Sequence, residues 1–500
     1  MVNTKKKVNI TEETKIEVQE TDIPDDEVNW CSVSLSEVVK NSNRIEASVF
    51  KIEARHAREA LLSCKYGATL KKFCGQDSFT QIAYYPNRFK RIYLPKNKES
   101  IPFYLPSQLN EIYPKPGKFI SSITDTCIEE LKPKINTILL TRSGTIGNCS
   151  YVSKTLANKV FSDDVIRISF NNDYDCGYIY AFLKTNIGQL LIKTNNYGSV
   201  ISHIEPKHLE NIDIPNPPDI LKKEIHNLIV KSYDLRDEAN DLIDEAEKLL
   251  IQELKLPPIE DFKPKYYDKQ TDVRNFEVSL SKLNNRLDGS YHVPLVNCLL
   301  THLKNNADEI LQLGNKLFSN RIILAGVFKR TYVGENEGVP FLGGKEIMQL
   351  SPNVEKFLSR KVHDKLIKKS LEVKENMILI TDRGTIGNVM IVPKHFEGWT
   401  VSQNVIKLEC SSENIAGYIY AFLNSSYGNI FLQRETYGSV INMIDDKNVA
   451  KIPIPLLKNK EIQLKINNLV LEANQKRYEA YKLEQKAIRM VNEKVIYATK

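Results

Sequence analysis

The sequence predicts an α+β fold with two homologous domains separated by two long helices. Three observations predict it. The second half of the chain repeats the first, each half combines short β-branched runs with a helical stretch, and each half ends in a long stretch free of proline and glycine. We expect the long helices to form an antiparallel coiled coil and the halves to be related by a pseudo-twofold axis.

The internal repeat is the strongest signal. ILLTRSGTIGNCSYV, which begins at Ile138, returns as ILITDRGTIGNVMIV at Ile378, a shift of 240 residues. At the same shift, GYIYAFLKTNIGQLLIKTNNYGSVI at Gly177 matches GYIYAFLNSSYGNIFLQRETYGSVI at Gly417 without a gap. Runs such as NTILLT predict strands, and GYIYAFLKTNIGQLLIK has the length and spacing of a helix. A constant shift over such lengths indicates that a whole domain is duplicated.

Two long helices are expected at Asp219 to Leu254 and at Asn459 to Val495. Apolar and small residues alternate there in steps of four and three, the spacing of a coiled-coil seam, and each helix would be roughly 50 Å long. The alternative is a helix that packs on its own domain. The predicted interface residues are Leu221, Ile225, Leu228, Leu235, Leu242 and Leu249 in the first helix and Ile462, Ile466, Leu469, Leu483 and Met490 in the second.

These elements predict the domain boundaries. We expect a flexible tail at 1–28, a first domain at 29–218, a spacer helix at 219–256, a linker at 257–275, a second domain at 276–457 and a second spacer helix at 458–496. The linker could extend about 65 Å, so its length alone also allows a parallel helix pair. We prefer the antiparallel pair because it makes the two halves equivalent.

The composition is ordinary for a soluble globular chain, with 42% hydrophobic and 26% charged residues. The sequence has no apolar run near the roughly 18 residues of a membrane span, and its N-terminal stretch lacks the apolar middle of a secretory signal. We therefore expect a cytoplasmic protein without membrane contact. The net charge of +7 suits a polyanionic partner but does not identify one.

The eight cysteines are scattered, without a C-x-x-C pair or histidines at metal-binding spacing. We expect reduced thiols, with neither a structural zinc site nor a disulfide framework. The sequence therefore predicts no metal site.

The order of the parts resembles the specificity subunit of type I restriction-modification systems. The R-x-G-T-I-G-N type loop, the YIYAFL helix, the YGS turn, the I-x-I-P strand and the heptad helix follow one another twice, from about Trp30 to Val495. The resemblance implies two target-recognition domains that each read one half of a bipartite site in double-stranded DNA. It also implies that the helices set the spacing and dock two adenine methyltransferase (modification) subunits, which recruit ATP-driven restriction subunits.

We expect no catalysis by this chain itself. NPPD at Asn216 lacks the closing aromatic residue of an amino-methyltransferase motif, and no glycine-rich cofactor loop precedes it. Pro217 and Pro218 are expected to end a strand before the first long helix. The sequence also lacks a G-x-x-x-x-G-K-[ST] loop for ATP. The resemblance therefore implies that S-adenosylmethionine, ATP and Mg²⁺ bind to partner subunits and that this chain binds no cofactor.

Differences between the halves separate the candidate DNA contacts. Residues identical in both halves cannot distinguish two half-sites, so GTIGN is expected either to form a structural turn or to present N–H groups to phosphate. Just before it, Arg142 and Ser143 are replaced by Asp382 and Arg383, an exchange that suits the reading of different bases. The unmatched stretches 49–88 with 291–327, and 106–134 with 344–374, should hold most of the discrimination.

The full set of predicted DNA contacts combines several roles. The basic residues at 90–91 and 329–330 suit phosphate or form a solvated strand, the tyrosine and serine of YGS touch DNA or close a turn, and residues 203 and 442 are candidates for reading bases. The set is Lys90, Arg91, Arg142, Ser143, Thr145, Asn148, Tyr197, Ser199 and His203 in the first half, and Lys329, Arg330, Asp382, Arg383, Thr385, Asn388, Tyr437, Ser439 and Asn442 in the second.

Two other functions fit the sequence. A stand-alone DNA-binding or decoy protein would keep the recognition domains without methyltransferase partners, and an interaction scaffold would bind no nucleic acid. Copurification with two methyltransferase chains separates the specificity subunit from the stand-alone binder. Salt-dependent DNA binding excludes the scaffold.

Overall fold

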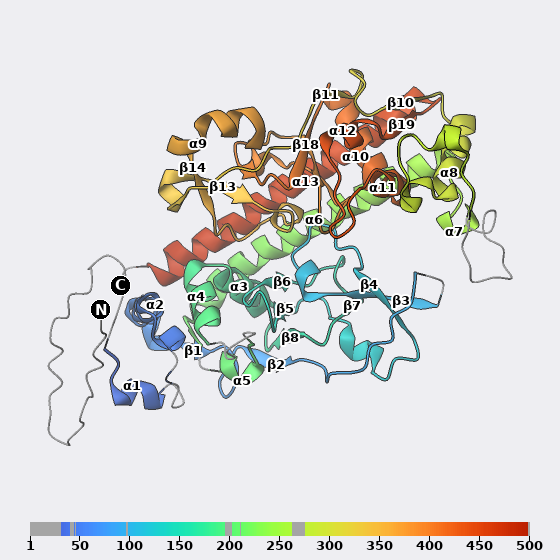
Figure 1. The fold of residues 1–500 in the computed structure, drawn as a ribbon. Coiled ribbons are helices and arrows are strands. Elements are labelled where there is room, and N and C mark those ends of the chain that lie inside the picture. The colour runs from blue at the N-terminus through green and yellow to red at the C-terminus, as the bar shows by residue number, and fades with distance from the viewer. Residues whose placement is uncertain are drawn as a thin grey trace, which may run out of the picture. The chain divides into compact units, whose positions relative to one another are not determined.

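The computed structural model describes residues 32–40, 45, 47–96, 99–195, 203–210, 212–262 and 276–498 (Figure 1). The chain divides into two compact units, Met1–Ile52 and Glu53–Lys500. Within the first, the described residues form helix α1 (Leu35–Lys40) and a 3-10 turn, Ala47–Phe50. The predicted tail at 1–28 and residues 263–275 of the predicted linker lie outside the described residues. The duplicated architecture belongs to the second unit.

The first half of the larger unit contains two main sheets. An antiparallel sheet has the strand order β2 (Thr80–Tyr84), β8 (Val165–Phe170), β5 (Ile138–Thr141) and β6 (Cys149–Tyr151). In the second sheet, β3 (Ser100–Tyr104) pairs antiparallel with β4 (Lys118–Ser121) and parallel with β7 (Val160–Phe161). A short strand, β1 (Lys71–Lys72), pairs with β9 (Asp213–Ile214).

The second half repeats this topology. Its antiparallel sheet has the order β11 (Ser319–Ile323), β18 (Val405–Cys410), β15 (Ile378–Thr381) and β16 (Val389–Ile391). Its second sheet has the order β12 (Tyr332–Val333), β14 (Phe357–Ser359), β13 (Gly338–Leu342) and β17 (Thr400–Val401), with β13 and β17 parallel. β10 (Glu309–Gln312) pairs with β19 (Pro453–Leu456). The register also repeats, because Ile138 pairs with Ile168 and Ile378 pairs with Leu408.

The shorter helices also correspond. The first half contains α2 (Ile52–Ser63), α3 (Asp173–Leu183), α4 (Asn186–Thr194) and α5 (Pro206–Leu209). The second contains α8 (Pro294–Asn306), α9 (Arg360–Leu366), α10 (Glu413–Asn424), α11 (Ser426–Arg434) and α12 (Asp446–Ala450), and α7 (Ile259–Phe262) lies between the halves in sequence. α4 and α11 begin alike, since Thr185 and Ser425 each accept an N-capping hydrogen bond from a glycine three residues later.

The duplicated backbone extends beyond the residues that match in sequence. Residues 106–134 and 344–374 do not match in sequence, yet both continue from equivalent strands, β3 and β13, through a 3-10 turn to β4 and β14. The backbone path is held alike: Gln108 Oε1 accepts from the N–H of Leu105, and Glu346 Oε2 accepts from the N–H of Gly343. The side chains of the two stretches differ while the turn-forming contacts remain.

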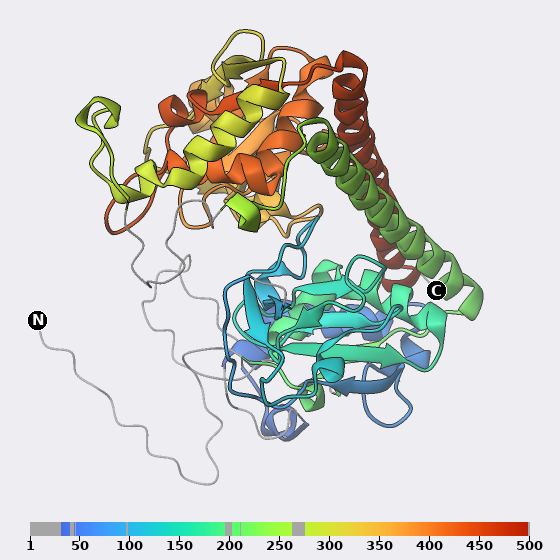
Figure 2. The ribbon, with the colours of Figure 1, turned by 90° about the vertical axis from the view of Figure 1, so that its right-hand side faces the viewer.

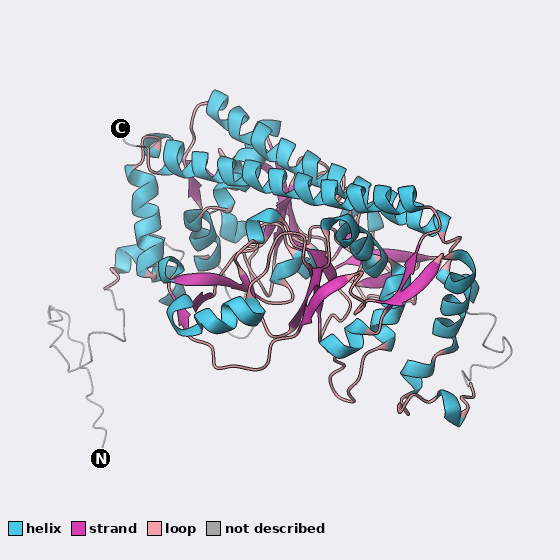
Figure 3. Cartoon of the chain, turned by 90° about the horizontal axis from the view of Figure 1, so that it is seen from above, coloured by secondary structure: helices cyan, strands magenta, loops and turns pink. Residues whose placement is uncertain are grey.

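The two long helices, α6 (Asp219–Glu253) and α13 (Lys460–Val491), lie side by side (Figures 1 and 2). Glu224 pairs with Lys494 just beyond α13 at 3.9 Å, Ser232 donates to the carbonyl oxygen of Ala480 at 2.7 Å, and Lys465 pairs with Glu245 at 3.1 Å. Residue numbers rise along one helix as they fall along the other, so the helices run in opposite directions. Figure 3 shows the same pair from above.

Each long helix contributes to the cores of both halves. The first core contains Ile225, Ile229 and Tyr233 of α6 with Ala487, Met490 and Val491 of α13, and the second contains Ala239, Ile243 and Leu250 of α6 with Ile466, Val470 and Ala473 of α13. The alternative of packing on the helix's own domain thus holds for the first part of each helix. The second part of each helix completes the core of the other half.

The predicted interface residues differ in their burial. The buried ones are Ile225, Ile466, Leu469 and Met490, and the half-buried ones are Leu221, Leu228, Leu235, Leu242, Leu249, Ile462 and Leu483. Alanines and a serine at the contact let the two backbones approach closely. The most buried side chains of α6 also include Ile229 and Tyr233, which a two-helix seam does not require, because a globular domain covers a wider face of the helix.

Glycine permits close contact between the long helices and the short helices α3 and α10. A Cβ on Gly177 would lie 2.7 Å from Cα of His226 in α6, and one on Gly417 would lie 2.3 Å from the carbonyl oxygen of Asn467 in α13. In both halves the glycine N–H donates to the side chain of that helix residue, at 3.2 and 2.9 Å. The repeated glycine therefore fixes each long helix against its own domain.

Candidate nucleic-acid interface

The GTIGN loops form the same turn in both halves. The glycines Gly144 and Gly147 have φ of 76° and 94°, and Gly384 and Gly387 have φ of 75° and 86°, in the left-handed region that favours glycine. The hydroxyl of Thr141, at the end of β5, closes the turn by donating to the carbonyl oxygen of residue 145 at 2.6 Å, and its counterpart in β15 does the same at 2.5 Å. GTIGN therefore forms a closed turn in each half.

The two glycines of each loop have different surroundings. Gln189 of α4 donates to the carbonyl oxygen of Gly147 at 3.0 Å, and Asn429 of α11 donates to that of Gly387 at 2.9 Å. A Cβ on the first glycine of either loop, by contrast, would meet nothing within 4 Å. Each loop is therefore anchored to a helix at its second glycine and open at its first. The open tip leaves room for the phosphate contact, which stays a prediction.

The segment after YGS lies beside the loop in both halves. The N–H of Ile204 donates to the carbonyl oxygen of Arg142, and the N–H of Ile444 donates to that of Asp382, both at 2.9 Å. His203 bridges the backbone of Ser143 in the same way that Met443 bridges Arg383. Two candidate segments that are about 60 residues apart in sequence thus form one surface in each domain. Tyr197 and Ser199 lie outside the described residues.

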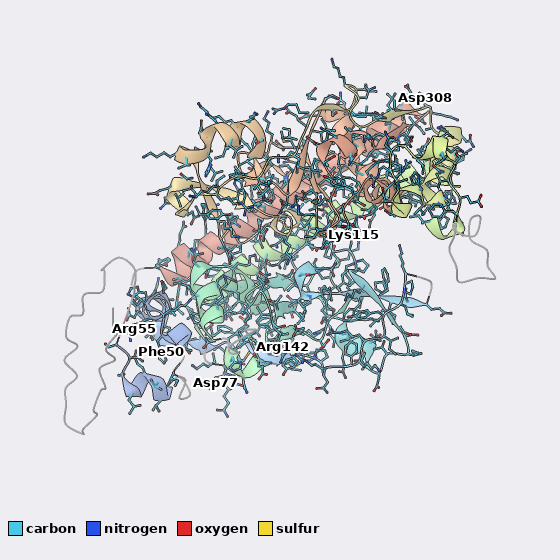
Figure 4. All side chains as sticks on the ribbon, in the orientation of Figure 1. Phe50, Arg55, Asp77, Lys115, Arg142 and Asp308 are labelled. Carbon is cyan, nitrogen blue, oxygen red and sulfur yellow. The ribbon has the colours of Figure 1, made fainter. Side chains whose placement is uncertain are left out.

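Arg142, which is labelled in Figure 4, precedes the loop tip and is buried. Its residue is only 9% exposed, and its guanidinium pairs with Asp164 at 3.2 Å and with Glu205 at 3.6 Å and stacks over Tyr85. Ser143 also donates to the Asp164 carboxylate. A base contact by Arg142 would require these ion pairs to open. In this structure Arg142 supports the loop from inside the domain.

Asp382, the counterpart of Arg142, is also buried. Its carboxylate accepts from Arg383, with 3.0 Å between Oδ2 and Nη2, and its residue is 1% exposed. Burial raises the pKa of Asp382, and the hydrogen bond from Arg383 opposes that rise. Although Arg142 and Asp382 carry opposite charges at equivalent positions, each forms an ion pair next to its own loop tip. Arg383, with 40% of its side chain exposed, presents the accessible charge of the second loop.

The arginine of each basic pair contacts a neighbouring side chain, and Arg330 is nevertheless exposed. Arg91 forms an ion pair with Asp163, and Arg330 donates to Oε1 of Gln403 at 2.7 Å, which is the equivalent position of the second half. Both guanidinium groups also stack on phenylalanine rings. Lys90 and Lys329 are exposed. In the first pair Lys90 is more accessible to a phosphate than the half-buried Arg91, whereas both residues of the second pair are exposed.

The remaining candidates vary in exposure. Thr145, Thr385, Tyr437, Ser439 and Asn442 are exposed. The asparagines that end the loops, Asn148 and Asn388, are half-buried, and their carbonyl oxygens accept backbone hydrogen bonds from Thr141 and Thr381 at 2.9 and 3.1 Å. The DNA contacts of all these residues stay predictions.

Sequence reasoning missed two apolar residues beside the second loop. Val440 and Ile441 are 94% and 59% exposed, directly between Ser439 and Asn442. Their signal was available, because SVI stands in both halves at the shift of 240. An exposed apolar pair between polar candidates suits contact with a thymine methyl group or a sugar.

The loop of the first domain also lines a cavity of about 310 Å³. Its lining includes Thr145 and Asn148 of the first half and Arg330, Lys356 and Asn404 of the second half. Among the described residues, no cluster of acidic, histidine or cysteine side chains could hold a metal ion. In that same part of the chain, no helix has the length and apolar character to cross a membrane.

A family model supplies the deciding comparison. The type I restriction modification DNA specificity domain matches residues 84–247 and 327–479, together more than half of the chain. The chain belongs to this family. Both matched ranges end within the long helices, and together they contain every predicted DNA contact named above.

Solved structures of low identity also resemble this specificity-domain chain. The S subunit of a type I restriction-modification system from M. genitalium is 15% identical, with 84% of this chain and 97% of that chain covered and a TM-score of 0.28. The HsdS subunit from Thermoanaerobacter tengcongensis is 13% identical, with 83% and 98% covered and a TM-score of 0.23. Such low TM-scores add nothing to the family assignment, which rests on the two sequence matches. A comparison with curated proteins finds no match.

Proposed function

We propose that this chain reads a bipartite DNA site for a type I restriction-modification complex. The observation that carries the proposal is the presence of two specificity domains of one topology on a single chain, joined by two helices that share both cores. Each domain presents one GTIGN loop beside one post-YGS segment. Two equal surfaces at a fixed separation suit a target whose two halves are separated by unread base pairs.

We infer that the halves are related by a pseudo-twofold axis and that α6 and α13 act as a coiled-coil spacer. Supporting this, Gly177 contacts α6 as Gly417 contacts α13, and each helix leaves its own core to enter the other. A twofold arrangement presents the two reading surfaces in opposite orientations along a duplex. The separation of the half-sites then depends on the helices.

The outward faces of the long helices are proposed to dock two adenine methyltransferase subunits. Lys223, Lys231 and Asp234 of α6, and Lys482 and Lys486 of α13, are exposed there. In this proposal S-adenosylmethionine, ATP and Mg²⁺ belong to the methyltransferase and restriction subunits, and the present chain is a non-catalytic reader. Its place of action is the cytoplasm, where host DNA is available.

The test is to express this chain with candidate adenine methyltransferase subunits from the same genome and to map methylated adenines by single-molecule sequencing. A bipartite motif with one fixed gap, absent when this chain is omitted, is the expected result. A chain that binds DNA in a salt-dependent way but copurifies with no methyltransferase would instead be a stand-alone binder. Absence of DNA binding would contradict both functions.

A further inference from the structure

The two domains contact each other directly, beside the long helices. Residues 109–115 of the first domain meet residues 347–353 of the second, and we call these two segments the clasp. The N–H of Ile112 donates to the carbonyl oxygen of Met348 at 2.9 Å, and Glu111 forms an isolated antiparallel bridge with Gln349. The segments come from equivalent positions, since each follows the 3-10 turn after β3 or β13.

An apolar contact anchors the clasp. Ile112, only 8% exposed, belongs to a hydrophobic cluster whose other buried members come from the second domain and α13. They include Ile347 and Leu350 of the opposite clasp segment and Ala480 near the middle of α13. Ile112 thus leaves its own domain core and fills a position in the core of the other half.

Polar contacts surround this apolar contact. Tyr113 donates to Asp244 of α6 at 2.5 Å, and Lys115, labelled in Figure 4, donates to the carbonyl oxygen and Oδ1 of Asn424 at 2.9 Å. In the other direction, Ser351 accepts from Gln485 of α13 at 3.2 Å and from Lys184 at 3.5 Å. Lys184 and Asn424 are equivalent, 240 residues apart at the ends of α3 and α10. The contact is therefore reciprocal.

Asn240 of α6 connects the clasp to both long helices. Its residue is 4% exposed, its Oδ1 accepts from Arg477 of α13 at 3.3 Å, and its Nδ2 donates to the carbonyl oxygen of Ile112 at 3.2 Å. The same Nδ2 lies 3.2 Å from the hydroxyl of Thr155 in the first domain. If this buried amide loses one of these hydrogen-bond partners, the folded state is destabilised, because no water takes the place of the lost partner. Asn240 therefore favours one relative position of the two helices and the clasp.

We propose that the clasp, together with Asn240, determines how many base pairs separate the two half-sites. The inference rests on the proposed reading of a bipartite site. Adding one base pair moves the half-sites apart by about 3.4 Å and rotates them by about 35°. A helix pair resists the change in length, but resistance to rotation requires a contact away from the helix axes. The clasp supplies that lateral contact between the domains.

The experiment measures the gap of methylated sites for the full chain coexpressed with its methyltransferase subunits. One variant combines Tyr113→Phe with Lys115→Met, which breaks the polar contacts of the clasp and leaves Ile112 in place. A second variant is Asn240→Leu. The matched control is Lys154→Met, which breaks an exposed ion pair with Asp241 of α6 that lies within the first half.

In the clasp variants we expect unchanged half-sites but methylation at gaps one base pair longer and shorter, raised at least about tenfold over wild type. The control should keep the single gap. A single unchanged gap in both clasp variants would overturn the clasp proposal while leaving the bipartite reading intact. A wild-type chain that yields no bipartite motif would instead remove the proposed function, and with it the clasp proposal.

The two variants differ in their risk to folding. Asn240→Leu disturbs a buried position, whereas the Tyr113→Phe and Lys115→Met pair changes a half-buried tyrosine and an exposed lysine at the edge of the contact. Melting temperatures of both chains, measured beside the control, separate a loosened gap from a damaged fold. If Asn240→Leu does not fold, the double variant alone decides the question.

Discussion

A buried ion pair joins the two long helices. Glu484 of α13 is fully buried, pairs with Arg236 of α6 at 2.9 Å and accepts from the hydroxyl of Tyr180 at 2.5 Å. Tyr233 of α6 extends the network by donating to the Tyr180 oxygen. Buried ion pairs are weak sources of stability, but they penalise every register that separates them. This cluster therefore specifies how α6 and α13 align.

Arg236→Leu is expected to lower the free energy of unfolding by about 3–5 kcal/mol, because it leaves a buried carboxylate without its cation. Arg236→Leu combined with Glu484→Leu should recover most of that loss. Chemical denaturation of the three chains measures it. The exposed pair of Lys476 and Glu238 on the same helices is the control, since Lys476→Met should change stability by less than about 1 kcal/mol. An equally large loss in the control would contradict the argument.

The pH dependence of this pair has a defined sign. Burial by itself would raise the pKa of Glu484, but the charges of Arg236 and Lys184 outweigh it and hold the pKa at about 2. An unfolded glutamate titrates near 4.3. The contribution of Glu484 to stability is therefore complete above about pH 4.3 and is lost as the pH falls toward 2. Over that interval the free energy of unfolding of wild type should fall relative to that of the Arg236→Leu, Glu484→Leu chain, which has no carboxylate at position 484.

At the scale of elements, the glycines that lie against the long helices leave no room for a side chain. Gly417→Ala would place a methyl group 2.3 Å from the carbonyl oxygen of Asn467, so α10 and α13 must separate. We expect a loss of about 1–3 kcal/mol in the free energy of unfolding. Gly289→Ala is the control, because a Cβ there meets nothing within 4 Å. The melting temperatures of both variants test this prediction. Equal losses of stability in the two variants would show that steric packing is not the cause.

The clasp segment should also respond to pH. Burial raises the pKa of Glu111 to about 7, against the opposing hydrogen bond and charge of Lys115. Because the folded pKa lies above the unfolded value near 4.3, this group's contribution is complete below about pH 4.3 and is lost as the pH rises through 7. Hydrogen exchange at residues 109–115 should quicken over that range, beyond its intrinsic pH dependence. Glu111→Gln should remove the extra dependence, and persistence of it would assign the effect to another group.

The sequence predicted the positions of the long helices well. It did not predict which surfaces pack against their buried faces. The expected stretches at 219–254 and 459–495 agree closely with Asp219–Glu253 and Lys460–Val491, because caps and heptad spacing are local signals. The sharing of cores could not be predicted, since periodicity identifies a buried face but not the surface that buries it. The ion pairs of Arg142 and Asp382 could not be predicted for a related reason. Opposite charges at one loop position suggested different bases, whereas each residue forms an ion pair inside its own domain.

At the scale of the whole molecule, the shared cores define what can be exchanged as a module. Residues 29–218 were expected to be a complete recognition domain, but the core of the first half also contains Ala487, Met490, Val491, Val495 and Ile496 from the end of α13 and its final turn. The N–H of Lys65 also donates to the carbonyl oxygen of Ala498 at 3.2 Å. The structural module is therefore discontinuous. Its two parts lie at opposite ends of the sequence.

Exchange of residues 29–218 for another specificity domain should change only one half-site, but the chain should be less stable than either parent. The end of α13 would then pack on a core with which it does not match, and mismatched cores commonly cost about 1–3 kcal/mol. Exchanging residues 487–498 from the same donor should restore the melting temperature without changing the other half-site. Methylation mapping and thermal melting of both chimaeras measure the two effects separately. A change in both half-sites would contradict the interpretation that each domain recognises one half-site independently. Equal stability of the two chimaeras would contradict the proposal that residues 487–498 stabilise the first core.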